Sequence, residues 1–253
     1  MDIVHKTVLI TGAGIGLGRA TALALASEGY KVAVTDVLDS EGSETVNCIR
    51  QQGGSADFYH LDVTNSAAVN EVVTQVERNQ GNLSALVLNA GIARTLPLSE
   101  LTDDQWDTTL DVNLKGMMRV LRAAIPSLKA SNNASVVCLA SIVGAVLGWS
   151  EHIPYCASKG GVAGLVRAAA LELAAYGIRV NGIAPGVIRT AQTLDPVNSL
   201  GEDGLAQFAN TVPLGRVGEP ADIANVASFL LSEKAGYLTG QIISVDGGTT
   251  ISL

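Results

Sequence analysis

The chain has 253 residues, of which 47% are hydrophobic and only 16% are charged, and this suits one large α/β domain. Its net charge of −8 disfavours phosphate backbones and anionic membrane surfaces, so we expect neither nucleic-acid nor membrane binding. Three unpaired cysteines, no signal-peptide core and no apolar run of transmembrane length predict a soluble, cytoplasmic protein.

Short apolar runs typical of buried strands alternate with helical stretches along the whole chain. The predicted strands cover 8–11, 31–36, 58–63, 85–89, 136–141, 179–184 and 242–245. The predicted helices lie near 17–28, 40–52, 66–80, 103–129, 156–176 and 220–232, with Ser66 and Asp103 as expected N-caps. This alternation predicts a parallel sheet with right-handed crossovers in a single domain over 1–253.

The stretch 190–212 breaks this rhythm. It follows a predicted strand and mixes Pro196, Gly201 and Gly204 with scattered polar residues. Long irregular insertions in compact domains are often lids over a binding site. We therefore expect a substrate lid here.

A glycine-rich turn follows the first predicted strand and leads into a helix. It reads Gly12-Ala13-Gly14-Ile15-Gly16-Leu17-Gly18. The backbone N–H groups of such a turn, together with the positive end of the helix dipole, can bind a pyrophosphate. The spacing is T-G-x-x-x-G-x-G and not G-x-G-x-x-G, so a plain glycine-rich connection is the alternative.

Asp36 ends the second predicted strand, where an acidic residue can bind the adenosine ribose hydroxyls and repel the extra phosphate of NADP. One charge pair at about 4 Å and an effective dielectric constant near 20 is worth up to roughly 4 kcal/mol. Neither Ile15 nor Val37 offers an offsetting positive charge. The sequence therefore favours NAD, and an ordinary exposed turn aspartate is the alternative.

Tyr155 and Lys159 stand four residues apart in a predicted helix, so their side chains share a face. A free phenol, with a pKa near 10, is a poor base at neutral pH, and a neighbouring ammonium favours the phenolate. Lowering the phenol's pKa to near 7 takes roughly 4 kcal/mol, which a partly desolvated cation could supply. Taken alone, the spacing is common by chance and favours an ordinary surface helix pair.

Together, these motifs resemble those of the short-chain dehydrogenase/reductase family, in its compact single-domain branch. The matching segments cover nearly the whole chain: Thr11-Gly12-x-x-x-Gly16-x-Gly18, Asp36, Asp62-Val63, Asn89-Ala90-Gly91, Asn113, Ser141, Tyr155-x-x-x-Lys159, Pro185-Gly186-x-x-x-Thr190 and 240–248. One position departs from the pattern, since Leu88 stands where a first asparagine is usual. The resemblance implies an α/β, Rossmann-like, doubly wound fold, with a seven-stranded parallel sheet ordered 3-2-1-4-5-6-7 and helices on both faces.

The resemblance also implies roles for these residues. Tyr155 is expected to exchange a proton with the substrate oxygen, and Ser141 to polarise that oxygen. Lys159 is expected to lower the pKa of Tyr155 and bind the nicotinamide ribose, and Asn113 to hold a water in a proton relay. The expected NAD contacts are Gly12, Gly14, Ile15, Gly16, Leu17, Asp36, Asp62, Val63, Asn89, Ala90, Gly91, Tyr155, Lys159, Pro185, Gly186, Ile188 and Thr190.

The predicted reaction is NAD(H)-dependent interconversion of a secondary alcohol and a ketone, on a small and largely apolar or neutral substrate. We expect this substrate between Ser141, Tyr155 and the lid, with His152 as a further candidate contact. Arg94 and Arg189 are the only evident cations for an anionic substrate, and no metal-ligand cluster is visible. The expected apolar surround of the substrate is Val143, Ala145, Val146, Leu147, Trp149, Ile153 and Val187.

Some alternatives remain open at this level. The small-residue run 160–175 usually forms part of a subunit interface in the family, which implies a homotetramer, but core packing within one subunit would also explain it. An epimerase or dehydratase of the same superfamily is a rival function, disfavoured because such relatives tend to be longer. A nucleotide-binding protein without turnover is the other rival, disfavoured because the four expected catalytic residues are all present.

Overall fold

Seven parallel strands form the centre of the computed structural model, which describes residues 6–252. Their order across the sheet is β3-β2-β1-β4-β5-β6-β7, so the predicted sheet and strand order are confirmed. The strands are β1 (Thr7–Thr11), β2 (Lys31–Asp36), β3 (Ser55–His60), β4 (Leu83–Leu88), β5 (Ser135–Leu139), β6 (Arg179–Pro185) and β7 (Ile242–Val245).

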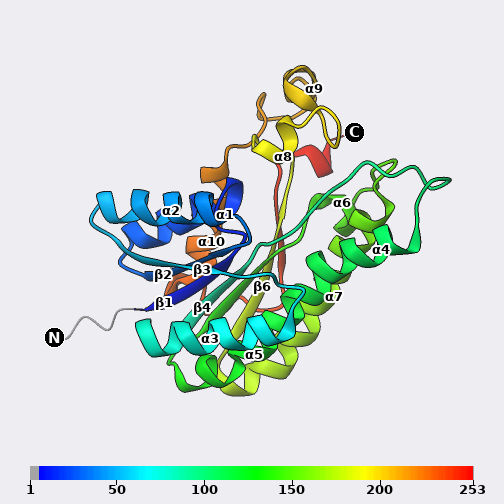
Figure 1. Cartoon of the computed structure of the whole chain (residues 1–253). Helices are drawn as coiled ribbons and strands as arrows, with labels where there is room; N and C mark the ends of the chain where they lie inside the picture. The colour runs from blue at the N-terminus through cyan, green and yellow to red at the C-terminus, as the bar shows by residue number, and fades with distance from the viewer. Residues whose placement is uncertain (1–5, 253) are drawn as a thin grey trace.

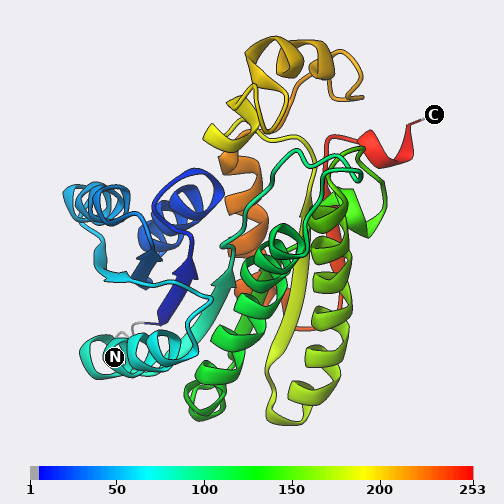
Figure 2. The same cartoon turned by 45° about the vertical axis from the view of Figure 1, so that its right-hand side comes forward.

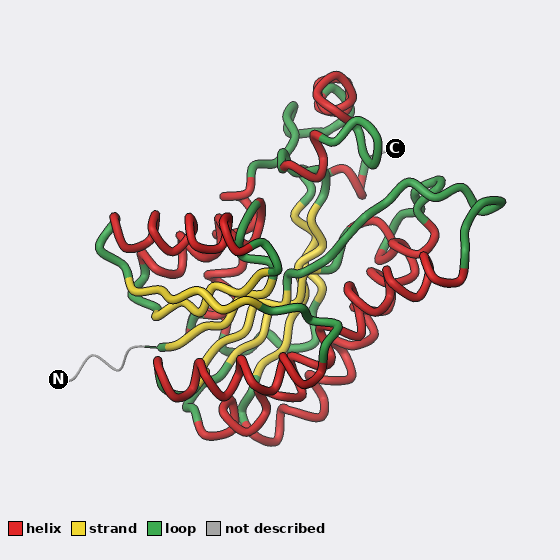
Figure 3. Tube along the Cα trace, in the orientation of Figure 1, coloured by secondary structure: helices red, strands yellow, loops and turns green. Residues whose placement is uncertain are grey.

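Helices cover both faces of the sheet (Figures 1 and 3). One face carries α1 (Gly16–Ser27), α2 (Asp39–Gln51) and α10 (Pro220–Leu231). The other carries α3 (Ser66–Gln80), α4 (Asp103–Leu110), α5 (Gly116–Ala130) and α7 (Ile153–Leu173).

Each face of the sheet has its own apolar core. Successive residues of a strand point to opposite faces, so Val8 and Ile10 belong to the core under α1 and α10, while Leu9 belongs to the core under α3 and α5. All three side chains are fully buried. Burial on both faces explains why the strands appear in the sequence as continuous apolar runs.

The predicted helix over 103–129 is interrupted. A five-residue π-helical segment, Asp111–Lys115, joins α4 to α5. Such wide turns are often found at functional sites, and this one holds the fully buried Asn113.

Several predicted boundaries are wrong by one to three residues, and three of them have a clear physical reason. β3 runs over Ser55–His60 and not 58–63, because its register with β2 pairs the first and last residues of both strands. Asn65, not Ser66, caps α3 and accepts the N–H groups of Ala67 and Ala68 at 3.0 and 3.1 Å. Thr102, not Asp103, caps α4 in a reciprocal pair with Gln105.

The predicted lid contains two short helices, α8 (Ala191–Leu194) and α9 (Gly201–Ala209). They stand beyond the carboxyl ends of the strands (Figure 2). The remaining short elements are α6 (Ile142–Ala145), η2 (Ala174–Tyr176), η3 (Glu233–Ala235) and η4 (Thr249–Ile251). Within residues 6–252, no helix combines the length and apolar character that a membrane crossing needs.

Candidate active site

A cavity of about 650 Å³ opens at the carboxyl ends of the strands, around the gap between β1 and β4 where the winding direction of the sheet reverses. Ligands of open α/β sheets bind at this switch point. Every predicted cofactor contact except Gly14 lines the cavity, as do Ser141, Tyr155 and Lys159.

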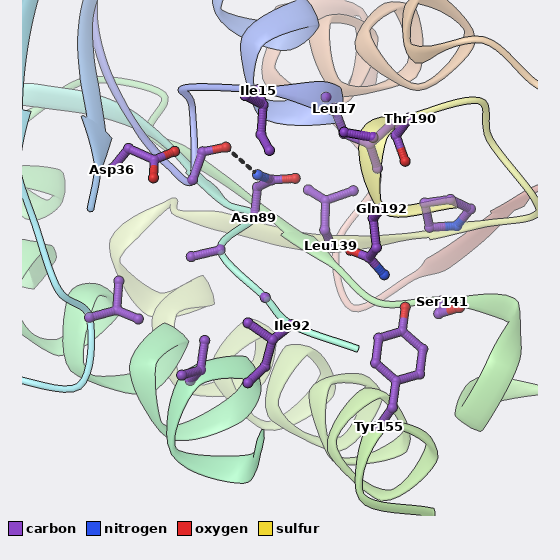
Figure 4. A pocket seen from close by; sticks show the side chains of 18 of the residues that line it. Ile15, Leu17, Asp36, Asn89, Ile92, Leu139, Ser141, Tyr155, Thr190 and Gln192 are labelled. Carbon is purple, nitrogen blue, oxygen red and sulfur yellow. Dashed lines mark hydrogen bonds between the residues drawn. The ribbon is translucent and has the colours of Figure 1, made fainter. Parts of the chain in front are cut away.

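The glycine turn forms one wall of the cavity. Gly12 and Gly16 have φ values of +63° and +56°, which glycine adopts without strain. A Cβ at Gly18 would overlap the carbonyl oxygen of Gly12, so the turn packs directly on the start of α1. Asn89 holds the turn by donating from Nδ2 to the carbonyl oxygens of Thr11 and Gly12 at 3.0 and 2.9 Å (Figure 4).

No side chain caps the N-terminus of α1. Its first backbone N–H groups therefore remain available to an anion, and the helix dipole adds to the attraction.

Asp36 lines the cavity at the end formed by the glycine turn and is only 7% exposed. Its Oδ2 accepts the N–H of Gly14 at 2.8 Å, and its Oδ1 accepts the N–H of Leu38 at 3.1 Å. These bonds fix the carboxylate. Gly14 does not line the cavity and instead supports Asp36, with no room for a Cβ because one would lie 2.9 Å from Oδ2.

The chemical groups gather at the opposite end of the cavity (Figure 4). Ser141 follows β5 and caps α6, where its Oγ accepts the N–H of Val143 at 3.1 Å. Tyr155 lies in the first turn of α7 and Lys159 one turn later. The Lys159 ammonium donates to the carbonyl oxygen of Leu139 at 2.7 Å and lies 5.7 Å from the centre of the Tyr155 ring.

Burial governs the ionisation of this pair. It raises the pKa of the Tyr155 phenol above its ordinary value, and a hydrogen bond with Ser141 opposes the rise. It also lowers the pKa of Lys159 from 10.5 to about 8. Lys159 is not among the groups that shift the pKa of the phenol here, since its ammonium lies beside the ring and donates to the Leu139 carbonyl oxygen. Its expected effect on the phenol stays a prediction. At neutral pH, Tyr155 holds its proton.

Asn113 lies behind the cavity wall and does not line it. Its amide forms a pair of hydrogen bonds with the backbone of Ile92 at 2.8 and 2.9 Å, and Nδ2 also donates to Ser158 Oγ at 3.1 Å. A Cβ at Gly91 would lie 3.3 Å from Asn113 Oδ1 and 3.6 Å from Lys159 Nζ. Asn113 thus holds the segment around Gly91 and Ile92, which lies between Asn113 and the cavity.

His152 does not line the cavity either, although we expected it as a candidate substrate contact. Its buried ring stacks on Trp149 at 3.9 Å between ring centres. Nδ1 lies 2.9 Å from the Ser150 carbonyl oxygen and Nε2 lies 3.4 Å from that of Asn198, which belongs to the lid. The residue therefore connects the loop before α7 to the lid.

The expected apolar surround of the substrate also lies elsewhere. Val143, Ala145, Val146, Leu147, Trp149 and Ile153 are not among the lining residues, and Val187 lines a second, smaller hollow. Arg94 does not line the cavity, and Arg189 is paired with Glu202 at 2.7 Å. Among the lining residues, Lys159 is the only lysine or arginine.

The sequence reasoning missed several lining residues. Most are chain neighbours of the recognised motifs, and that adjacency is the signal that could have found them. They are Val37, Leu38, Leu61, Thr64, Ile92, Thr108, Val112, Leu139, Ala140, Ala191, Gln192 and Thr193.

A doubly wound sheet with a nucleotide-type turn at one end of its cavity, and a serine, tyrosine and lysine at the other, defines a Rossmann-like oxidoreductase. The family model described as "Enoyl-(Acyl carrier protein) reductase" matches residues 12–250. The chain belongs to the short-chain dehydrogenase/reductase family, as the motifs predicted, and its members bind a nicotinamide cofactor.

Similar proteins cover nearly the whole chain. The 3-oxoacyl-[acyl-carrier-protein] reductase FabG of Thermotoga maritima is 38% identical over 99% of this chain and 100% of its own length. That of Staphylococcus epidermidis is 39% identical over 97% of this chain and 99% of its own. Levodione reductase, a solved structure, superposes with a TM-score of 0.91 at 34% identity, covering 98% of both chains. A putative gluconate dehydrogenase from Agrobacterium tumefaciens reaches the same TM-score at 31% identity, covering 98% of this chain and 97% of its own.

Proposed function

We propose that this protein interconverts a secondary alcohol and a ketone with NAD(H). The observation that carries the proposal is that the Tyr155 hydroxyl and Ser141 face one end of a cavity whose other end is formed by the glycine turn and Asp36. The relatives named above are reductases and a putative dehydrogenase, which agrees with this reaction type.

The residues present fit a dinucleotide. The positive φ angles of Gly12 and Gly16 and the uncapped start of α1 suit a pyrophosphate, and the fixed Asp36 carboxylate suits two ribose hydroxyls. When bound, a nicotinamide cofactor supplies or accepts the hydride.

The chain's own residues handle the proton and the charge on the substrate oxygen. In the direction of reduction, the protonated Tyr155 donates its proton to that oxygen as negative charge develops there. Ser141 donates a hydrogen bond to the same oxygen, and Lys159 stabilises the phenolate that remains. In the direction of oxidation, the phenolate takes the proton back.

The preference for NAD rests on Asp36. A phosphate on the ribose would meet a buried carboxylate held by two backbone N–H groups, and Lys159, the only cation of the lining, belongs to the opposite end of the cavity. We also propose a small neutral substrate, because the apolar side chains of Ile92 and Leu139 line the cavity near Tyr155 and Ser141.

The test is to follow the absorbance of NADH with the purified chain and a panel of ketones, with NADPH in parallel. We expect turnover with NADH and a lower kcat/KM with NADPH. Turnover with neither cofactor on any ketone or alcohol would contradict the proposal, whereas a preference for NADPH would contradict only the role of Asp36.

We further propose a homotetramer in the cytoplasm, with α7 at a subunit interface. The small residues of this helix lie on two faces, one packed within the subunit and one open to solvent. A Cβ at Gly161 would meet Leu114 of the same subunit, while Gly164 has open space beside it and Leu171 is 83% exposed. Light scattering should give about four times the 26.0 kDa mass of the chain, and Leu171→Lys should lower it.

A further inference from the structure

Gln192 enters the cavity from the lid side. It is the second residue of α8 and its side chain points toward Tyr155 and Ser141 (Figure 4). Within residues 6–252, the Gln192 amide has no hydrogen-bond partner, and the residue is exposed to the cavity. Both a donor and an acceptor are therefore available to whatever fills this space.

The backbone beneath Gln192 is firmly held. Thr193 Oγ1 donates to the carbonyl oxygen of Ile188 at 2.6 Å, and its N–H donates to Thr190 Oγ1 at 3.3 Å. The N–H of Thr190 in turn donates to Thr193 Oγ1 at 2.9 Å. The backbone position from which Gln192 enters the cavity is thus fixed by the hydrogen bonds of α8.

Gln192 differs from the other polar groups near it. The hydroxyls of Thr190 and Thr193 are bonded to each other and to the backbone, and Lys159 is bonded to Leu139. An amide that a ligand shields from water without a partner costs roughly 1–3 kcal/mol. A substrate that fills the cavity without an oxygen or nitrogen opposite Gln192 therefore binds at a disadvantage.

We infer that Gln192 is a specificity-determining residue whose amide N–H donates a hydrogen bond to a second oxygen atom of the substrate. The preferred substrate is then a ketone that carries another hydroxyl or carbonyl oxygen, and not a purely hydrocarbon ketone. The inference rests on the proposed function and adds the substrate class. A site built to bond an oxygen discriminates strongly against an analogue that lacks it.

The test compares ring ketones with and without that oxygen. The probes are cyclohexanone, 2-hydroxycyclohexanone, 4-hydroxycyclohexanone and cyclohexane-1,4-dione, each with NADH and the full chain. We expect at least one oxygenated ketone to exceed cyclohexanone in kcat/KM by roughly tenfold or more, and Gln192→Met to reduce that ratio by roughly tenfold. Methionine keeps the length of the side chain and removes both polar atoms of the amide.

Two further variants separate the loss of the amide N–H donor from a general effect of replacing a glutamine. Gln192→Glu keeps the shape but cannot donate when ionised, so it should lose the same preference. Gln207→Met makes the same chemical change on α9, outside the cavity lining, and should leave the ratio unchanged.

If the unsubstituted protein had equal kcat/KM values for all four ketones, the role of Gln192 would be overturned, but the proposed function would not. A Gln192→Met variant that keeps the preference but raises the KM for NADH would also overturn that role, since Gln192 would then be a cofactor contact. Absence of turnover by the parent would overturn the proposed function, and this inference with it.

Discussion

In the proposed reaction, Tyr155 is the residue on which proton transfer depends. Its burial raises the pKa of the phenol, so at neutral pH the proton is held for donation to the substrate oxygen. Tyr155→Phe removes that proton and little else, so kcat should fall by at least roughly 100-fold. NADH affinity, measured by fluorescence titration, should change less than about twofold.

Tyr237→Phe is the matched control, because that tyrosine is fully exposed and does not line the cavity. Its kcat and its NADH affinity should equal those of the unsubstituted protein. If Tyr155→Phe kept more than about a tenth of the parent's kcat, Tyr155 would not be the proton donor.

Asp36 is the residue that we propose to determine the preference for NAD over NADP. Asp36→Asn keeps the shape of the side chain and removes the charge that opposes a ribose phosphate. The ratio of kcat/KM with NADH to that with NADPH should therefore fall by at least roughly tenfold. Asp57→Asn, which changes a carboxylate of β3 paired with Arg50, should leave the ratio alone. An unchanged ratio in Asp36→Asn would place the ribose elsewhere.

Among the elements, the glycine turn and α1 have the least room for change. A methyl group at Gly18 would overlap the Gly12 carbonyl oxygen, so Gly18→Ala must push the turn away from the helix. We expect a loss of stability of roughly 1–3 kcal/mol and a NADH Kd raised by at least roughly tenfold. Chemical denaturation and fluorescence titration measure the two effects.

Gly148→Ala provides the comparison, because nothing lies within 4 Å of a Cβ at that position and its φ is not positive. Stability and NADH affinity should both remain near those of the parent. If Gly18→Ala and Gly148→Ala had the same stability and the same NADH affinity, the close approach of the turn to α1 would not be required for either property.

The elements also show what the sequence could predict. The strand order was predictable only through the resemblance to a known family. The catalytic motifs were predictable because each depends on local residues in a fixed order, such as Tyr155 and Lys159 on one helix face. The limits of β3 were not, because they follow from its register with β2 and not from its own apolar residues. Leu61 and Val63, which suggested a later strand, are instead buried beyond its end.

Side-chain direction was the second thing that could not be predicted. His152 stands only three residues before Tyr155, yet its ring stacks on Trp149 and reaches the lid. Gln192 was missed because the lid has no hydrophobic period, and its position depends on the hydrogen bonds of Thr193. The position of His152 depends on a contact with a distant segment of the chain, whereas that of Gln192 depends on local hydrogen bonds that no sequence pattern reveals.

At the scale of the whole molecule, the site combines two parts of the sheet. β1 and β2 provide the glycine turn and Asp36, while β5 and the start of α7 provide Ser141 and Tyr155. The apolar cores on both faces hold these strands in register. This packing, together with the pairing of β1 with β4 and of β4 with β5, therefore sets the separation between the two ends of the cavity.

Lys159 connects this site to the stability of the entire fold. Its pKa is about 8 in the folded chain and near 10.5 when unfolded, so the unfolded chain binds more protons between those values. The free energy of unfolding should therefore rise with pH from about 8 to 10.5. Below that window, keeping the buried ammonium charged has a net cost of roughly 3 kcal/mol.

Lys159→Met should consequently abolish turnover while raising Tm at pH 7 by several degrees, on the order of 5 °C. The difference in Tm from the parent should shrink as pH rises toward 10, because the parent's lysine then loses its proton on folding at little cost. Lys234→Met, at an exposed lysine of η3, should show no such dependence on pH. A Tm difference that stays constant from pH 7 to 10 would mean that Lys159 remains fully charged in the fold, and that its ammonium is stabilised there as well as in water.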